Sequence, residues 1–332
     1  MSSIKHVLYA VKNPDSRRQP GLDKAVTIAK TFGASLELFH AISSPVFLEL
    51  QPLTGTTLPQ IRREALALRG KRLERLAVQA RKHHVTTTCK VEWDFPPHEA
   101  IVRRARKSGA ELIIAECHQG RRLTPWLMHL TDWELLRESP VPVLLLKNGR
   151  PWQRRPKILA SVDPSHAHAK PSGLDAQILE QADRVAGKFH GAVHVMHANA
   201  PSVFGLSLGD PAIDAVTLAA TYDQLKLKAK REFDAFAKRE HVPAARRHLV
   251  DHDAIYAIPD VARKLRADLV VMGALSRSGL KRVFIGNTAE RVLNALPCDV
   301  LVVKPAHVEK RVGPKSRGMQ VIAPQPLMPM PL

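Results

Sequence analysis

Cysteine is scarce in this chain of 332 residues, which contains three: Cys89, Cys117 and Cys298. Their odd number and wide spacing exclude a disulfide framework and a cysteine zinc site. Long apolar runs are absent as well, since no window approaches the ~18 residues that a membrane span requires. The opening residues, MSSIKHVLYAVKN, lack the basic and apolar regions of a secretory signal. We therefore expect a cytoplasmic protein without a membrane span.

Acidic residues are outnumbered by basic ones, 31 against 50, so the formal net charge is +19. Such a charge suits a polyanionic partner, either nucleic acid or an anionic membrane surface. Much of it falls on apparent helices, however, as in residues 62–84, where basic residues alternate with an apolar stripe at helical spacing. Aromatic residues make up 5% of the chain, and no nucleic-acid recognition motif accompanies the charge. We therefore favour a solvated helix face over nucleic-acid binding.

The chain contains two copies of one unit. Residues 110–147 align without a gap with residues 267–304, so that Pro140 falls on Pro297 and Lys147 on Lys304. Each copy alternates apolar strands with helices, and its Val/Ile/Leu runs are typical of strands buried on both faces. This pattern predicts an α/β protein with two tandem, doubly wound parallel sheets.

Composition sets the expected boundaries of the two domains. The first copy covers residues 1–148, and the linker, rich in Pro and Arg, covers 149–156. The second copy covers residues 157–308. From 309 to 332 the chain is basic, contains many prolines and has no periodicity, which predicts a disordered tail.

In a doubly wound sheet, ligands bind beside the carboxyl ends of the strands, where the strand order reverses. In the second copy, Asp163 follows the first strand, and Gly273 would let a ligand approach the backbone. Gly286, Asn287 and Thr288 open a helix whose free N–H groups attract anions. A plainer alternative stays open: Asp163 is also suited to a turn, and Asn287 or Thr288 to a helix N-cap.

These residues resemble the nucleotide motif of the universal stress protein family, which has the form G-x-x-G, nine residues, then G-S or G-T. Gly273 fills the first glycine and Gly286 the third. Ser276 stands in place of the second glycine, and Asn287 in place of Ser or Thr. With the duplication and the strings GNTAERV and TDWELLR, the likeness extends over about residues 4–305 and points to the tandem, E-type members.

The resemblance implies a Rossmann-like, five-stranded parallel sheet per domain, with the last strands pairing the halves into a pseudo-dimer that could form a further homodimer. It also implies an adenine nucleotide such as ATP, with Mg²⁺, as the small-molecule ligand of the second domain. Ser276 would then have to avoid a positive φ angle close to the phosphates. The implied contacts are Asp163 with adenine, Met272 and Gly273 with base and ribose, and Gly286, Asn287 and Thr288 with phosphate.

The first copy departs from this motif at every matching position. The gapless alignment sets Glu116, Gln119, His129 and Leu130 against Gly273, Ser276, Gly286 and Asn287. A carboxylate and bulky side chains therefore replace the bare backbone, and the charge of Glu116 would repel phosphate. We expect the first domain to be degenerate, with a structural role or another ligand.

Motifs for catalysis or metal binding are missing from the sequence. It has no G-x-S-x-G elbow, no Walker loop and no H-E-x-x-H. The histidine groups at 166–168, 194–197 and 248–252 are explained more simply as surface or core residues. His194 and His197 would point to opposite faces of a strand. We therefore expect no enzyme, with slow ATP hydrolysis left open, and no metal site.

The function predicted from the sequence is that of a tandem universal stress protein. The resemblance implies a non-enzymatic role in the cytoplasmic response to starvation, oxidative stress or DNA damage, with a degraded nucleotide cleft in the second domain. Two alternatives stay open. One is an ATP-binding switch, and the other is a carrier or sensor of an apolar or anionic metabolite. The carrier would use the loops 43–59 and 200–216, whose apolar residues lie beside prolines, unless those loops pack the two halves together.

Overall fold

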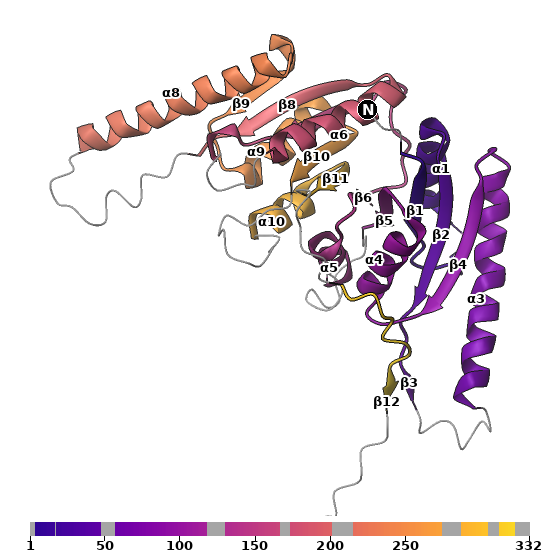
Figure 1. Ribbon diagram of the computed structural model, residues 1–332. Coiled ribbons are helices and arrows are strands. Elements are labelled where there is room, and N and C mark those ends of the chain that lie inside the picture. Colours follow the sequence, from indigo (N-terminus) through magenta and orange to yellow (C-terminus); the bar gives the residue numbers. More distant parts are fainter. Residues whose placement is uncertain are drawn as a thin grey trace, which may run out of the picture. The chain divides into compact units, whose positions relative to one another are not determined.

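The computed structural model describes residues 4–16, 18–47, 57–117, 130–166, 173–200, 215–273, 287–304 and 312–322. The chain divides into two compact units. We name them the N-terminal unit, which comprises residues 2–141 and 309–332, and the C-terminal unit, which comprises residues 142–308. Figure 1 shows the strands and helices of both, coloured along the sequence. In the described part of the chain, no helix is long and apolar enough to cross a membrane.

The N-terminal unit is built on parallel strands in the order β4-β2-β1-β5. The strand order reverses beside β1, as it does in doubly wound folds. Its strands are β1 (His6–Ala10), β2 (Ser35–Ile42), β4 (Thr87–Trp93) and β5 (Leu112–Glu116), besides the short β3 (Val46–Phe47). Its helices are α1 (Pro20–Phe32), α3 (Leu58–Arg81), α4 (Pro97–Ser108) and α5 (Leu130–Glu138).

The C-terminal unit has the strand order β6-β11-β10-β7-β8-β9, and β6 is antiparallel to β11 while the others are parallel. Here the order reverses beside β7. Its strands are β6 (Val143–Leu146), β7 (Lys157–Ser161), β8 (Ala192–Ala198), β9 (Arg247–Val250), β10 (Leu269–Gly273) and β11 (Asp299–Val303). Its helices are α6 (Leu174–Phe189), α8 (Ala215–Arg239), α9 (Ala254–Leu265) and α10 (Asn287–Ala295), with short 3₁₀ turns η2 (Pro164–His166) and η3 (Ala244–Arg246).

The predicted α/β class and the pairing of the two last strands are confirmed. Val300 of β11 faces Leu145 of β6 in an antiparallel ladder. Because this ladder joins β6 to β11, the compact units divide between residues 141 and 142, ahead of β6 and of the boundary at 148 expected from composition. The unit to which a strand belongs is therefore set by its hydrogen bonds to neighbouring strands more than by its position in the sequence repeat.

The repeat is also visible in local backbone geometry. α4 and α9 cover corresponding residues of the two copies, and each is followed by a left-handed residue, Gly109 (φ 70°) and Arg266 (φ 52°). α1 and α6 likewise end at left-handed residues, Gly33 (φ 69°) and His190 (φ 52°). Such C-terminal caps end a helix by binding its last carbonyl groups. Equivalent positions in the two copies can therefore be compared residue by residue.

The long basic helix predicted at residues 62–84 is α3. Its buried side chains are Leu73, Ala77 and Ala80, whereas basic residues such as Arg62 and Lys71 are exposed. The helix begins with a capping box between Thr57 and Gln60. The charge of this segment thus lies on a solvated face, as we favoured from the sequence.

The segment 312–322 differs from the disordered tail expected at residues 309–332. Its last residues form β12 (Val321–Ile322), which pairs in parallel with β3. The backbone N–H groups of Arg317 and Gly318 donate to Asp94 Oδ1 at 2.9 and 3.2 Å. A buried carboxylate therefore orders these residues despite their polar composition. Residues 305–311 and 323–332 lie outside the described residues.

Candidate functional site

The predicted nucleotide cleft lies in the C-terminal unit, at the carboxyl ends of β7 and β10. These strands are adjacent and parallel, with Met272 facing Ser161 in the register. Asp163 follows β7 by two residues, so it lies at the same edge as Met272 and Gly273. Met272 is buried and Gly273 is half-buried. The three residues thus lie at one edge of the sheet, and their contacts with a nucleotide stay a prediction.

The phosphate side of the predicted site is described only in part. α10 begins at Asn287, so a helix N-terminus stands where the motif requires one. Ser276 and Gly286 lie outside the described residues, as do the side chains of Asn287 and Thr288. Their contacts with phosphate stay a prediction.

Asp163 is held by neighbours that sequence reasoning did not identify. Its backbone N–H donates to Asp175 Oδ1 at 3.1 Å, and its Oδ1 lies 3.6 Å from His197 Nδ1. The Asp163 side chain is 33% exposed, whereas that of His197 is 1% exposed. The carboxylate is thus supported from the interior and still faces solvent along one edge, as a ligand contact requires.

His197 connects β8 to the turn that follows β7. Its Nδ1 lies 3.2 Å from the carbonyl oxygen of Val162, and its Nε2 lies 3.1 Å from Ser165 Oγ. A carbonyl only accepts, so Nδ1 donates to Val162 and Nε2 accepts from the Ser165 hydroxyl. The imidazole also stacks on Phe233 of α8, with ring centroids 6.0 Å apart. His197 is therefore a positioning residue for the Asp163 turn. No local sequence pattern indicated this role, because His197 lies far from Asp163 in the sequence.

Gly273 has a packing role besides any role in binding. A Cβ at this position would lie 2.7 Å from Leu174 Cδ2 and 3.3 Å from Ile178 Cδ1, both on α6. Real Cβ atoms are essentially never found that close to a neighbour. A larger residue would therefore make the Leu174 side chain shift, so the packing of α6 on β10 favours glycine here.

The equivalent cleft of the N-terminal unit is closed by its own side chains. Glu116 ends β5 as Gly273 ends β10, and its Oε1 accepts from Tyr9 Oη at 2.6 Å and from the Gly21 N–H at 3.0 Å. Gly21 is the second residue of α1, so Glu116 binds a free N–H at a helix N-terminus, where an anionic ligand would otherwise bind. Tyr9 is 1% exposed, and burial, followed by the charge of Glu116, raises the pKa of its hydroxyl.

The charge pattern of this cleft is opposite to that of the C-terminal unit. Lys12 follows β1 by two residues, as Asp163 follows β7, so a basic side chain takes the place of an acidic one. Burial lowers the pKa of Lys12. A cavity of about 220 Å³ lies here, lined in part by Lys12, His40, Glu116 and Asp132. Ligand pockets usually have volumes of about 300–1,000 Å³. The cavity is thus smaller than most ligand pockets. Gln119, His129 and the Leu130 side chain lie outside the described residues.

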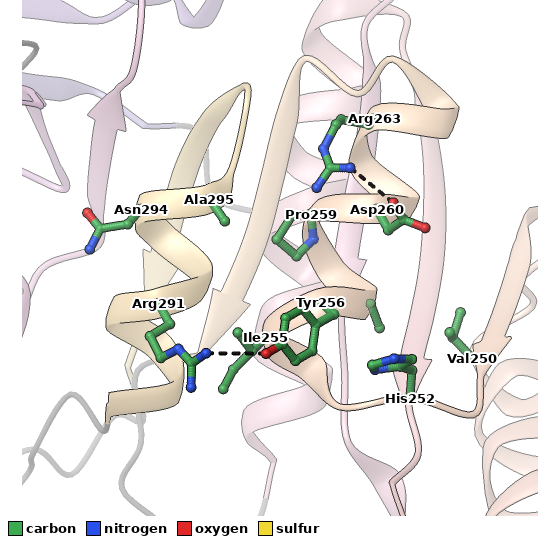
Figure 2. Close-up of a pocket in the computed structure, with 11 residues that line it drawn as sticks. Val250, His252, Ile255, Tyr256, Pro259, Asp260, Arg263, Arg291, Asn294 and Ala295 are labelled. Atoms are coloured by element: carbon green, nitrogen blue, oxygen red, sulfur yellow. Dashed lines mark hydrogen bonds and ion pairs between the residues drawn. The ribbon is translucent and has the colours of Figure 1, made fainter.

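A larger cavity, of about 580 Å³, lies in the C-terminal unit along α9 and α10 (Figure 2). Arg291 Nη2 lies 3.4 Å from the Tyr256 hydroxyl, and its guanidinium carbon lies 5.9 Å from the centroid of the Tyr256 ring. Arg263 and Asp260 form an ion pair at 3.0 Å on the wall of the cavity. Two arginines and an exposed tyrosine suit an anionic or aromatic group. No sequence motif indicated this cavity, because its lining comes from separate helices.

Two predicted histidine groups meet in the C-terminal unit. His194 Nδ1 lies 3.0 Å from His248 Nε2, on neighbouring strands β8 and β9. His197, on the opposite face of β8, makes the contacts with Val162 and Ser165. The predicted opposite orientation of His194 and His197 is therefore confirmed. This pair supplies two donors, fewer than the three protein ligands of a typical zinc site.

The His194–His248 pair predicts a loss of stability in acid. Burial, then the charges of His248, Arg246 and Lys157, lowers the pKa of His194 from 6.5 to about 4, and burial also lowers the pKa of His248. The unfolded chain therefore binds more protons than the folded chain below pH 6.5, so stability falls from there towards pH 4. After allowance for partial exposure we expect a loss of about 1 kcal/mol.

Urea unfolding measured at several pH values checks this expectation. The His194→Gln variant should lose less stability than the wild type over the same range, whereas His83→Gln, at an exposed position, should behave like the wild type. An unchanged acid slope in His194→Gln would contradict the assignment.

Fold and repeat define a tandem α/β protein of the Rossmann-like class, and comparison with known proteins identifies its family. A model of the universal stress protein family matches residues 3–147 and again residues 157–304. The chain therefore belongs to the universal stress protein family and carries two of its domains in tandem, as the resemblance in the sequence predicted.

Individual relatives agree with this assignment. The chain is 28% identical over 307 residues to universal stress protein E of Escherichia coli K12, which covers 92% of this chain and 95% of that protein. It is 25% identical over 316 residues to universal stress protein E of Photorhabdus laumondii, covering 92% and 96%. A crystal structure from Pseudomonas aeruginosa UCBPP-PA14, described as that of a universal stress protein, superposes with a TM-score of 0.68 at 25% identity, covering 92% and 95%. These relatives indicate a tandem stress-response protein.

Proposed function

We propose that this protein acts in the cytoplasmic stress response without catalysing a reaction, and that it binds an adenine nucleotide weakly and only in the C-terminal unit. The stresses that we propose are starvation, oxidative stress and DNA damage, by resemblance to the family. The single observation that carries the proposal is the asymmetry between the two clefts.

That asymmetry has a direct electrostatic meaning. In the N-terminal unit the Glu116 carboxylate already binds the N–H of Gly21 at the start of α1, and it would repel a phosphate group. In the C-terminal unit Gly273 presents backbone at the same position, and Asp163 stands beside it with a partly exposed carboxylate. A carboxylate accepts the N–H groups of an adenine ring, and bare backbone lets a ribose approach.

The proposed weakness of the site follows from its departures from the family motif. Ser276 replaces a glycine of that motif, and Asn287 replaces its Ser or Thr. A non-enzymatic role is supported by the family, whose members are generally stress-response proteins rather than enzymes. Nothing in the motifs of the sequence supplies a nucleophile or a base for turnover.

Calorimetric titration with ATP and Mg²⁺ tests the proposal. We expect the wild type to bind one nucleotide and Asp163→Ala to bind at least about tenfold more weakly, because a hydrogen bond to a charged group contributes about 1.5–3 kcal/mol. Lys12→Ala, the matched change in the N-terminal unit, should bind like the wild type. Absence of binding at millimolar ATP, or equal loss in both variants, would refute the proposed site, and steady ATP hydrolysis would refute the non-enzymatic role.

The cavity in Figure 2 favours a second candidate function, a carrier or sensor of an anionic metabolite. The loops that the sequence suggested for this role, 43–59 and 200–216, lie largely outside the described residues. Native mass spectrometry of purified protein should then show a retained anion that Arg291→Glu loses. Arg239→Glu, at an exposed arginine outside the cavity, should retain it.

A further inference from the structure

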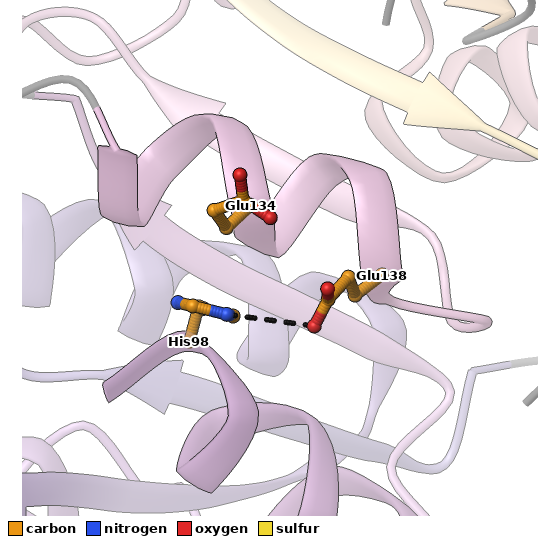
Figure 3. A group of neighbouring side chains, drawn as sticks. All are labelled: His98, Glu134 and Glu138. Carbon is orange, nitrogen blue, oxygen red and sulfur yellow. Dashed lines mark ion pairs between the residues drawn. The ribbon is translucent and has the colours of Figure 1, made fainter. Parts of the chain in front are cut away.

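We infer that the N-terminal unit holds a divalent metal ion between His98, Glu134 and Glu138, and that Zn²⁺ is the ion this donor set suits best. His98 is the second residue of α4, and the two glutamates lie one turn apart on α5 (Figure 3). Residues spaced by four in a helix point to the same side. One ligand atom from each residue lies within 4.8 Å of the other two.

The spacing of the donors fits an ion better than it fits a hydrogen bond. His98 Nε2 lies 3.4 Å from Glu138 Oε2, beyond the usual range of about 2.7–3.2 Å for N–H···O. Two ligands that each lie about 2.0–2.1 Å from a tetrahedral zinc are roughly 3.3 Å apart. The observed separation therefore corresponds to one edge of such a site.

The three side chains lie near the surface of the unit, where an ion can reach them. The side chains are half-buried, with 12% of His98 and 17% of Glu138 exposed. An imidazole and two carboxylates are nitrogen and oxygen ligands of the kinds that zinc binds, and three such ligands leave a fourth position for water.

Arg137 supplies positive charge to this cluster when no ion is bound. Its guanidinium pairs with Glu134, and its Nη2 lies 3.9 Å from Glu138 Oε1. The side chain is 34% exposed, so it can turn to solvent when an ion replaces it. Arg137 and the metal thus compete for the same carboxylates, which makes Arg137 a test residue outside the ligand set.

The repeat shows that this arrangement belongs to the first copy alone. The equivalent residues of the C-terminal unit are Ile255, Arg291 and Ala295, which line the cavity of Figure 2 and offer no metal ligand. The sequence predicted no metal site, because the histidine groups at 166–168, 194–197 and 248–252 were explained as surface or core residues. His98 belongs to none of these groups and lies far from the two glutamates in the sequence. Packing of α4 against α5 brings the donors together. An ion here would join these two helices and stabilise the unit.

Zinc titration of the full-length protein, after treatment with a chelator, tests the inference. We expect one zinc site that is weakened at least about tenfold in His98→Ala and in Glu138→Gln, the latter a change that preserves side-chain shape. His6→Ala is the matched control, because His6 lies 3.6 Å from a single carboxylate, that of Glu37. Its affinity should equal that of the wild type. Arg137→Gln should bind zinc more tightly than the wild type, since a competitor is removed.

Two further readouts separate a site from a structural ion pair. Co²⁺ in place of zinc should give visible absorption bands that disappear in Glu138→Gln. Zinc should raise the melting temperature of the wild type and of Arg137→Gln, and at the same zinc concentration it should raise that of His98→Ala less, since stabilisation follows the affinity of the folded state. Zinc affinity that is equal in the wild type, His98→Ala and Glu138→Gln would overturn the inference, as would weaker binding in Arg137→Gln.

Discussion

Replacing Arg103 with methionine should lower the free energy of unfolding of the N-terminal unit by about 3–5 kcal/mol. The Arg103 Nε and Nη2 donate to Asp94 Oδ2 at 3.0 and 2.7 Å, and Nη1 donates to Glu99 Oε2 at 2.8 Å. The side chains of Arg103 and Asp94 are 7% and 1% exposed. Methionine would fill most of the volume but leave two buried carboxylates without their main counter-charge.

The same carboxylates hold the segment 312–322. Asp94 accepts from the N–H groups of Arg317 and Gly318, and Glu99 forms an ion pair with the Arg317 side chain. Arg317 is 65% exposed, so it cannot replace a buried guanidinium. We therefore expect the Arg103→Met variant to show faster hydrogen exchange in β3 and β12 as well as earlier unfolding in urea.

The matched control is Arg263→Met, which breaks an exposed ion pair with Asp260 at 3.0 Å. Exposed pairs contribute about 0–1 kcal/mol, so this variant should unfold close to the wild type. Similar small losses in both variants would show that the Asp94 and Glu99 network is dispensable for stability.

Replacing Gly273 with glutamate, the residue of the first copy, should destabilise the C-terminal unit by about 3 kcal/mol or more. The new side chain would overlap Leu174 and Ile178, and overpacking of this kind costs about 1–3 kcal/mol. The carboxylate would also lack the partners that Glu116 has. Ala160 stands where Tyr9 stands in the first copy, and an unsatisfied buried polar group costs a further ~1–3 kcal/mol.

A double-mutant cycle with Ile178→Ala checks the cause. Removing the Ile178 side chain makes room for the glutamate, so the two changes together should cost about 1 kcal/mol less than their separate costs added. Urea unfolding of the four proteins measures the coupling. Additive costs, or a loss below about 0.5 kcal/mol for Gly273→Glu alone, would mean that α6 moves aside and that packing does not require glycine.

The sequence by itself determined the repeat, the α/β class and the edge of the sheet at which Asp163, Met272 and Gly273 lie. These features depend on periodicity and on residues close to strand ends, and adjacent parallel strands bring their carboxyl ends together whatever the rest of the chain does. The pairing of β6 with β11 followed from family resemblance, and the structure added its antiparallel direction. The exposure of the basic side chains in residues 62–84 could also be predicted, because a helix with a narrow apolar stripe must expose its remaining faces.

Only the tertiary structure decided the contacts between side chains far apart in sequence. Glu116 closes the first cleft because β5 ends beside the start of α1. Residues 312–322 are ordered because Asp94 offers a buried acceptor, which composition does not reveal. His98 meets Glu134 and Glu138 because α4 packs on α5. Such contacts depend on helix packing and rotamers over distances that no local pattern encodes, so their chemistry became visible only in the folded chain.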